Sequence, residues 1–163
     1  MIKFTNYYSK NFVLNWMKIK SQEENLLQEY ALRNTNCRKE ILSAFLSKGF
    51  ALTHADIEEN IAEAHDRVTV YRTLKTFLDK GLIHKVLDDG GSAKYALCKD
   101  SCHFEDHNHE HVHFKCTQCG QTNCIENIEV PKITLPLGYK AVEANLLIQG
   151  LCKDCNESNV GLR

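Results

Sequence analysis

The sequence predicts an α+β fold in two parts, an N-terminal winged helix-turn-helix followed by a smaller, cysteine-rich part. Two observations carry this prediction. Between residues 21 and 97, segments with the apolar spacing of helices precede two short strand-like runs. After them come two Cys-x-x-Cys pairs separated by 32 residues, Cys116 with Cys119 and Cys152 with Cys155.

Capping residues delimit the first two helices of the N-terminal part. Ser21 with Glu24 forms a capping box, which predicts that a short helix begins there. The second helix begins after Thr35 or Asn36 and ends at Gly49, because glycine is typical of helix C-termini.

Two further helices and a hairpin complete this part. The third helix begins at Thr53 with Asp56 as its capping partner, and the fourth runs from near Asp66 to Gly81. The inner face of the fourth helix carries apolar residues at helical spacing, namely Val70, Leu74, Phe77 and Leu78. Two strand-like runs within 82–97 flank Asp-Asp-Gly-Gly, a turn sequence that predicts the hairpin of the wing.

Composition limits the class of protein. With 163 residues and a formal charge of -1, the chain is too short for a large enzyme and has no overall basic field. Eight cysteines without a secretory signal favour the reducing cytoplasm and metal binding over disulfides. The apolar stretch at 12–14 is too short to span a membrane. Residues 1–20 carry four lysines and no acid, which predicts a disordered basic arm or a segment upstream of a start at Met17.

The Cys-x-x-Cys pairs predict a closed metal site. A short loop lets both thiolates of a pair bind one ion, and Gly120 after Cys119 relieves the turn. We call each Cys-x-x-Cys loop a knuckle. Two knuckles supply four sulfurs, the ligand set of a structural, tetrahedral Zn²⁺. The alternative is two pairs of free thiols or disulfides.

Alternating histidines lead into the first knuckle. His107, His109, His111 and His113 occupy every second position, and an extended segment would place His111 and His113 on one face. Such a face beside a thiolate site indicates a second metal site. The run by itself fits equally a solvated loop that binds metal adventitiously.

The fourth helix is the predicted DNA reader of the winged helix-turn-helix. With its apolar stripe inward, four residues project away from the core: Thr69, Tyr71, Arg72 and Lys75. The segment 66–85 holds five Lys or Arg against two acids, a local excess of +3 that suits phosphate contact. The alternative is an ordinary solvated face of an amphipathic helix.

Five motifs together resemble the ferric uptake regulator (Fur) superfamily over residues 24–156. They are Arg33-x-Thr35-x-x-Arg38, Val68-Thr69-Val70-Tyr71-Arg72-Thr73-Leu74, Gly81-Leu82-Ile83, His111-Val112-His113-Phe114-x-Cys116-x-x-Cys119-Gly120 and Cys152-x-x-Cys155. The resemblance implies a dimeric, metal-responsive repressor of operator DNA, with a C-terminal α/β dimerisation domain. It implies neither an enzyme nor a small-molecule substrate, and no membrane partner. The expected division is an extension at 1–20, a DNA-binding domain at 21–97 and a dimerisation and metal-binding domain at 98–163.

The resemblance also assigns residues. Tyr71 and Arg72 match the recognition-helix pair, Arg33 and Arg38 belong to a matched DNA-binding motif, and the four knuckle cysteines match the structural zinc site.

The sensing site is most similar to that of zinc uptake regulators (Zur). Tyr95-Ala96-Leu97-Cys98 resembles the zinc regulators' Tyr-x-Leu-Cys, whereas iron-sensing members have an acid where this chain has Ala96. The implied sensing ligands are His84, Cys98, His111 and His113, with Cys124, Cys102 and His103 as further candidates. Cys124 stands where the family usually has a glutamate.

Zinc is therefore the expected sensed metal, since a thiolate shifts preference from Fe²⁺ toward Zn²⁺. An iron or peroxide sensor is the alternative within the family, with Glu105, Asp106 or Glu110 as oxygen donors. Outside the family, the alternatives are a metal-dependent nuclease and a zinc store. Pro131 and Pro136 further predict that the family's long helix at 126–146 is truncated or kinked.

Overall fold

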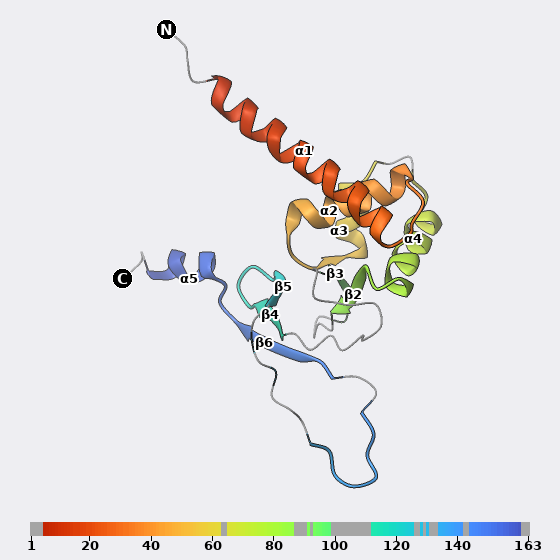
Figure 1. The fold of residues 1–163 in the computed structure, drawn as a ribbon. Coiled ribbons are helices and arrows are strands. Elements are labelled where there is room, and N and C mark those ends of the chain that lie inside the picture. The colour runs from red at the N-terminus through yellow and green to blue at the C-terminus, as the bar shows by residue number, and fades with distance from the viewer. Residues whose placement is uncertain are drawn as a thin grey trace.

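The computed structural model describes residues 5–62, 65–86, 91, 93–98, 112–125, 128, 130, 134–141 and 144–160 (Figure 1). Within these ranges, side chains are described from residue 15 to residue 158. The predicted ligands His111, Cys102 and His103 lie outside the described residues, as do the acids Glu105, Asp106 and Glu110.

The N-terminal part is a winged helix-turn-helix, as predicted. Its helices and strands are α2 (Asn36–Lys48), β1 (Leu52–Thr53), α3 (His54–Asn60), α4 (Arg67–Asp79), β2 (Ile83–Val86) and β3 (Lys94–Leu97). The three strands form an antiparallel sheet in the order β1-β3-β2. One apolar core joins α2, α3 and α4 to this sheet, with Ile41, Ile57 and Phe77 fully buried.

The predicted caps set the helix ends. Gly49 ends α2 in the left-handed conformation at φ 71°, which costs glycine little. Thr53 and Asp56 form the expected capping box of α3. The Asp66 carboxylate accepts a hydrogen bond from the Thr69 amide and caps α4.

Helix α1 (Thr5–Glu29) differs from the sequence prediction. It is one continuous helix that projects beyond the winged helix (Figure 1), so Ser21 lies inside it and not at its cap. Its sequence contains neither proline nor glycine, and nothing interrupts the helix before Ala31, which has φ 50°. Leu27 anchors its C-terminal end in the core. No helix in the described part of the chain is long and apolar enough to cross a membrane.

The C-terminal part is a second, smaller sheet. It contains β4 (Val112–Cys116), β5 (Thr122–Ile125) and β6 (Leu146–Gly150), and α5 (Lys153–Val160) follows it. The strand order is β5-β4-β6, with β4 and β6 parallel, so the chain between β5 and β6 is a crossover connection. The described residues of that crossover contain no helix, and the Tyr139 amide instead turns back to the carbonyl of Pro136 at 3.1 Å. This agrees with the predicted truncation of the family's long helix.

The two sheets contact each other along β5. The Ala51 amide donates a hydrogen bond to the carbonyl of Thr122 at 2.8 Å. The Lys94 ammonium donates to the carbonyl of Gly120 at 2.9 Å and to the Thr122 hydroxyl at 3.2 Å. These contacts hold β2 of the wing close to β4 of the C-terminal sheet.

We predict that Glu23→Gln flattens the pH dependence of stability. Glu23 is 4% exposed, and burial raises the pKa of its carboxyl group, although a hydrogen bond with Ser43 opposes this. The folded state therefore holds this proton more tightly than the unfolded chain does. The stabilisation that Glu23 contributes is greatest below the pKa it has in the unfolded chain, and it is lost as pH rises through the pKa it has in the folded state. Melting temperatures measured between about pH 4 and pH 8 should fall less in the variant than in the parent.

Glu24→Gln is the matched control for this measurement. The Glu24 side chain is exposed and pairs with the Lys39 ammonium at 3.0 Å, and its charge is the smallest of the causes that shift the pKa of Glu23. Its removal should therefore change stability and its pH dependence much less than Glu23→Gln does. Parallel curves for Glu23→Gln and the parent would contradict the prediction.

Candidate functional site

The four knuckle cysteines converge, as predicted. Cys116, Cys119, Cys152 and Cys155 place all four sulfurs within 4.8 Å of one another, with Cys119 Sγ and Cys152 Sγ 3.9 Å apart. In a tetrahedral zinc site with Zn–S bonds of about 2.3 Å, the sulfurs lie about 3.8 Å apart. None of these four cysteines forms a disulfide, which leaves this geometry available to a metal.

Local backbone structure builds this cluster. Gly120 has φ 73°, and its amide donates to the carbonyl of Cys116 at 3.0 Å, which closes the first knuckle. The Thr117 amide donates to the carbonyl of Gly150 at 2.8 Å and ties the end of β4 to the end of β6. The second knuckle begins at Cys152, two residues after β6 ends at Gly150, and continues into α5.

The thiol pKa values of the cluster and the charge of its thiolates favour a bound cation. Amide hydrogen bonds from Cys119 and then Cys152 lower the pKa of the Cys116 thiol to about 6. The hydrogen bond with the Cys152 side chain raises the pKa of Cys155 to about 12. One thiolate is thus favoured at neutral pH, whereas four adjacent thiolates require a bound divalent cation.

A second cluster lies between the two sheets. His84 Nε2 is 3.0 Å from His113 Nε2 and 3.5 Å from Cys124 Sγ. The three ligand atoms all lie within 4.8 Å of one another, and His84 and His113 are buried. Zinc with two nitrogens and a sulfur as ligands would space these atoms about 3.3–3.6 Å apart, so the donor set fits a zinc ion.

Strand register explains why these residues meet. His113 on β4 is the direct cross-strand partner of Cys124 on β5, and directly opposed side chains share a face. His84 on β2 is paired with Ala96 on β3, and Cys98 follows two residues after Ala96 on the same face. Register thus brings His113 and Cys124 together on the C-terminal sheet, and His84 and Cys98 together on the N-terminal sheet.

Cys98 occupies a different position around His84. Its Sγ lies 3.2 Å from His84 Nδ1, the ring nitrogen opposite the one that faces His113 and Cys124. Cys124, only a further candidate from the sequence, is therefore the sulfur grouped with the histidines, and Cys98 is not in that group. The signal that would have ranked Cys124 higher is the hairpin register that pairs it with His113.

The α4 residues that the sequence predicts to contact DNA lie on or near the outer face of this helix. Tyr71 is 60% exposed, and Arg72 and Lys75 are exposed beside it, while Val70, Leu74 and Phe77 face the core. Thr69 is partly engaged elsewhere, because its hydroxyl donates to Asp66 at 2.9 Å. Val68, which is not among the DNA contacts predicted from the sequence, is 56% exposed. It shares this face with Tyr71, Arg72 and Lys75, which follow it at positions i+3, i+4 and i+7.

A polar cavity of about 420 Å³ lies beside this face, between the N-terminal ends of α2 and α4. It is lined by Arg33, Thr35, Asn36, Cys37, Arg38, His65, Thr69 and Thr73. The Thr35 side chain makes no capping hydrogen bond to α2, so the first amides of this helix are not capped by that residue. Arg33, Arg38 and the N-terminus of α2 together form a surface that suits a phosphate group, and the Arg38 guanidinium is held there by a hydrogen bond to the carbonyl of Arg33 at 2.9 Å.

Comparison with known proteins places this arrangement in a family. The model of the ferric uptake regulator family matches residues 29–146. The ferric uptake regulation protein of Staphylococcus aureus is 29% identical over 136 residues, covering 81% of this chain and 94% of that protein. The protein of the same name from Staphylococcus epidermidis is 29% identical over 134 residues, covering 80% of this chain and 91% of its own length.

Solved structures share the fold. A zinc uptake regulator complexed with zinc and DNA is 23% identical and superimposes with a TM-score of 0.62, over 88% of this chain and 97% of that chain. A zinc-bound manganese uptake regulator is 19% identical, with a TM-score of 0.54 over 80% of this chain and 98% of that chain.

We predict that Cys116→Ser releases the metal of the four-cysteine cluster and dissociates the protein into monomers. A metal ion bound to the four sulfurs would hold the ends of β4 and β6 together, and its binding free energy would contribute directly to folding of the C-terminal part. Metal content and mass by light scattering should both fall after gel filtration. A folded dimer that retains the metal would refute this role.

Proposed function

The chain belongs to the ferric uptake regulator family, and we propose that within it this protein is a repressor controlled by zinc. Members are metal-responsive transcriptional regulators that bind DNA as dimers, and they are not enzymes. Zinc at the His84 cluster is the proposed signal, and a second zinc at the four-cysteine cluster is structural. Operator binding would place the protein in the cytoplasm.

The observation that supports zinc is the donor set of the second cluster. His84, His113 and Cys124 bring two imidazoles and a thiol within 4.8 Å of one another. Cys98 is the proposed fourth ligand on its resemblance to the cysteine of the zinc regulators' Tyr-x-Leu-Cys. Its Sγ contacts His84 at Nδ1, so this ligand set requires the His84 ring or the Cys98 side chain to turn when zinc binds. Two thiolates with two imidazoles are a soft, tetrahedral set that favours zinc over Fe²⁺.

The sensed zinc would act by joining the two sheets. Zinc supplies a bond to ligands in both parts of the chain, whereas the metal-free contact is a set of weaker hydrogen bonds. A shared ion restricts the angle between the winged helix and the dimerisation domain. In a dimer, that angle sets the spacing of two α4 helices along DNA, so metal favours the conformation that fits the operator.

Coupling of this kind is reciprocal. If zinc strengthens operator binding by some factor, operator DNA must strengthen zinc binding at the His84 cluster by the same factor. The four-cysteine cluster, whose ligands all come from the C-terminal part, should show no such coupling.

An iron or peroxide sensor is the second candidate. The relatives at 29% identity are named ferric uptake regulation proteins, which favours iron. Sensing of Fe²⁺ requires oxygen donors, and the described cluster offers sulfur from Cys124 where the family usually has a glutamate. The ligand chemistry therefore supports zinc.

Operator contact would involve α4 and the polar cavity together. The exposed Val68, Tyr71, Arg72 and Lys75 share the outer face of α4, where an apolar side chain and an aromatic ring suit base edges and thymine methyl groups. Arg33 and Arg38 at the α2 N-terminus would hold a neighbouring phosphate. Phosphate contacts fix the register in which α4 meets the bases.

We predict that Cys98→Ala and Cys124→Ala each lose metal-dependent DNA binding but keep the structural zinc and the dimer. Removal of one ligand from a four-ligand site should weaken the sensed zinc by at least about 10–100-fold. Zinc content per chain should fall from two to one after mild chelation, and zinc titrations in a DNA mobility-shift assay should show no response.

Zinc-responsive repression in either variant would exclude that cysteine from the site. A parent protein that responds to Fe²⁺ and ignores zinc would refute the zinc assignment. His111→Ala, measured alongside, tests the predicted ligand that lies outside the described residues.

We further predict that Arg72→Ala and Tyr71→Ala differ in how they weaken DNA binding. Loss of a phosphate contact at Arg72 should weaken all sequences similarly and reduce the salt slope by about 1. Loss of Tyr71 should instead cost about 1–3 kcal/mol at particular base pairs and reduce discrimination. Binding isotherms at several salt concentrations, on operator and scrambled DNA, separate the two. Parental binding by both variants would show that α4 is not the reader.

A further inference from the structure

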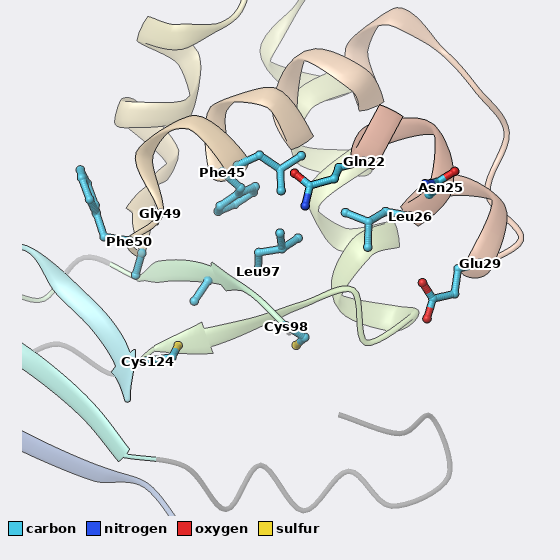
Figure 2. A pocket seen from close by; sticks show the side chains of 13 residues that line it. Gln22, Asn25, Leu26, Glu29, Phe45, Gly49, Phe50, Leu97, Cys98 and Cys124 are labelled. Carbon is cyan, nitrogen blue, oxygen red and sulfur yellow. The ribbon is translucent and has the colours of Figure 1, made fainter. Parts of the chain in front are cut away.

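Both thiols assigned to the sensing site open onto one cavity. It has a volume of about 440 Å³ and lies between α1, the end of α2 and the two sheets (Figure 2). Its lining consists of Gln22, Asn25, Leu26, Glu29, Phe45, Leu46, Gly49, Phe50, Ala51, Ala96, Leu97, Cys98 and Cys124. We call this space the thiol cavity.

Helix α1 supplies the polar side of the thiol cavity. Gln22, Asn25 and Glu29 recur at helical spacing on one face of α1, opposite β3 and the Cys98 that follows it (Figure 2). Their side chains are exposed, and Glu29 is the one charged group among the described residues of the lining. Most of the remaining wall is apolar and comes from α2 and β3.

The imidazoles of the sensing site are not among the described residues that line this cavity, whereas both thiols are. His84 is 7% exposed and His113 is 4% exposed; Cys98, at 5% exposed, and the half-buried Cys124 line the cavity. An ion that reaches the cluster from the thiol cavity meets sulfur before nitrogen. The size is also suitable, since six water molecules of about 30 Å³ each occupy roughly 180 Å³, well within the cavity.

We propose that the thiol cavity is the exchange route of the sensed zinc, with Glu29 and Asn25 of α1 at its mouth. This inference rests on the proposed zinc-sensing function. A hydrated Zn²⁺ enters with its water shell, which the Glu29 carboxylate and the two amides hydrogen-bond. Cys98 and Cys124 then replace water molecules as ligands, and each thiol loses its proton to solvent as the Zn–S bond forms.

An exchange route has a kinetic signature that a ligand does not share. A residue at the mouth changes the barrier between free and bound metal, so its substitution alters association and dissociation by the same factor. The equilibrium affinity then stays constant. Loss of a ligand would instead raise the dissociation constant.

The first test narrows the mouth. Asn25→Trp places a large side chain at the cavity, and Gln28→Trp is the matched control because Gln28 is an exposed amide on α1 that does not line it. Zinc uptake is followed in a stopped-flow instrument, and release is followed by transfer to a chromogenic chelator. We expect both rates to fall about tenfold or more in Asn25→Trp, with an unchanged dissociation constant, and to stay parental in Gln28→Trp.

The second test removes the charge. Glu29→Gln should slow zinc association about fivefold at low ionic strength, and the difference should vanish at high salt. Glu59→Gln is the control, because it deletes one exposed carboxylate on α3, away from the cavity. Equal association rates for Glu29→Gln and the parent at low salt would remove Glu29 from the route.

A third measurement does not depend on zinc sensing. In chelator-treated protein, a maleimide should alkylate Cys98 and Cys124 more slowly in Asn25→Trp than in Gln28→Trp, as quantified by peptide mass spectrometry. Cys37, which lines the other cavity, should react at the same rate in both.

The outcomes separate the two proposals. A parent that binds only the structural zinc overturns the sensing function and, with it, the exchange route. Normal binding of the second zinc with parental rates and parental alkylation in Asn25→Trp overturns the exchange route alone.

Discussion

The contact between His84 and His113 is the constraint on which the arrangement of this protein depends. Their Nε2 atoms lie 3.0 Å apart, and both side chains are buried where the wing sheet meets the C-terminal sheet. Two basic nitrogens at this distance, with little access to water, need a shared proton or a shared metal ion. In the proposed function, the angle between the part that carries α4 and the part that forms the dimer depends on what lies between these two rings.

Most of the N-terminal fold could be predicted because local interactions specify it. Gly49, the Thr53–Asp56 box and Asp66 end or begin helices through contacts within a few residues, and the structure confirms all three. Helix α1 was mispredicted at its start, because a good capping pair at Ser21 does not terminate a helix that has no breaker before it. Capping residues show where a helix can begin and not where it must.

The sites were predictable to the degree that their ligands are close in sequence. The knuckles follow from spacing alone, and the four sulfurs do converge. The second cluster draws on β2, β4 and β5, so its composition depends on strand register, which the sequence does not specify. Strand register pairs Cys124 with His113, and it places Cys98 against Nδ1 of His84, the ring nitrogen that does not face His113. The spacing of residues in the sequence does not show which of these two thiols lies closer to His113.

The parallel pairing of β4 and β6 gives the four-cysteine cluster a topological consequence. Cys116 and Cys152 stand 36 residues apart at the ends of adjacent strands, so a metal bound to both closes the crossover into a covalent-like ring. A cross-link over a loop of that length lowers the entropy of the unfolded chain by an amount worth about 4 kcal/mol. Such a clamp stabilises the sheet, and the described residues of the crossover, 128, 130, 134–141 and 144–145, contain no helix. The intervening sequence is then free to change in length and shape, provided that its two ends remain fastened by the metal.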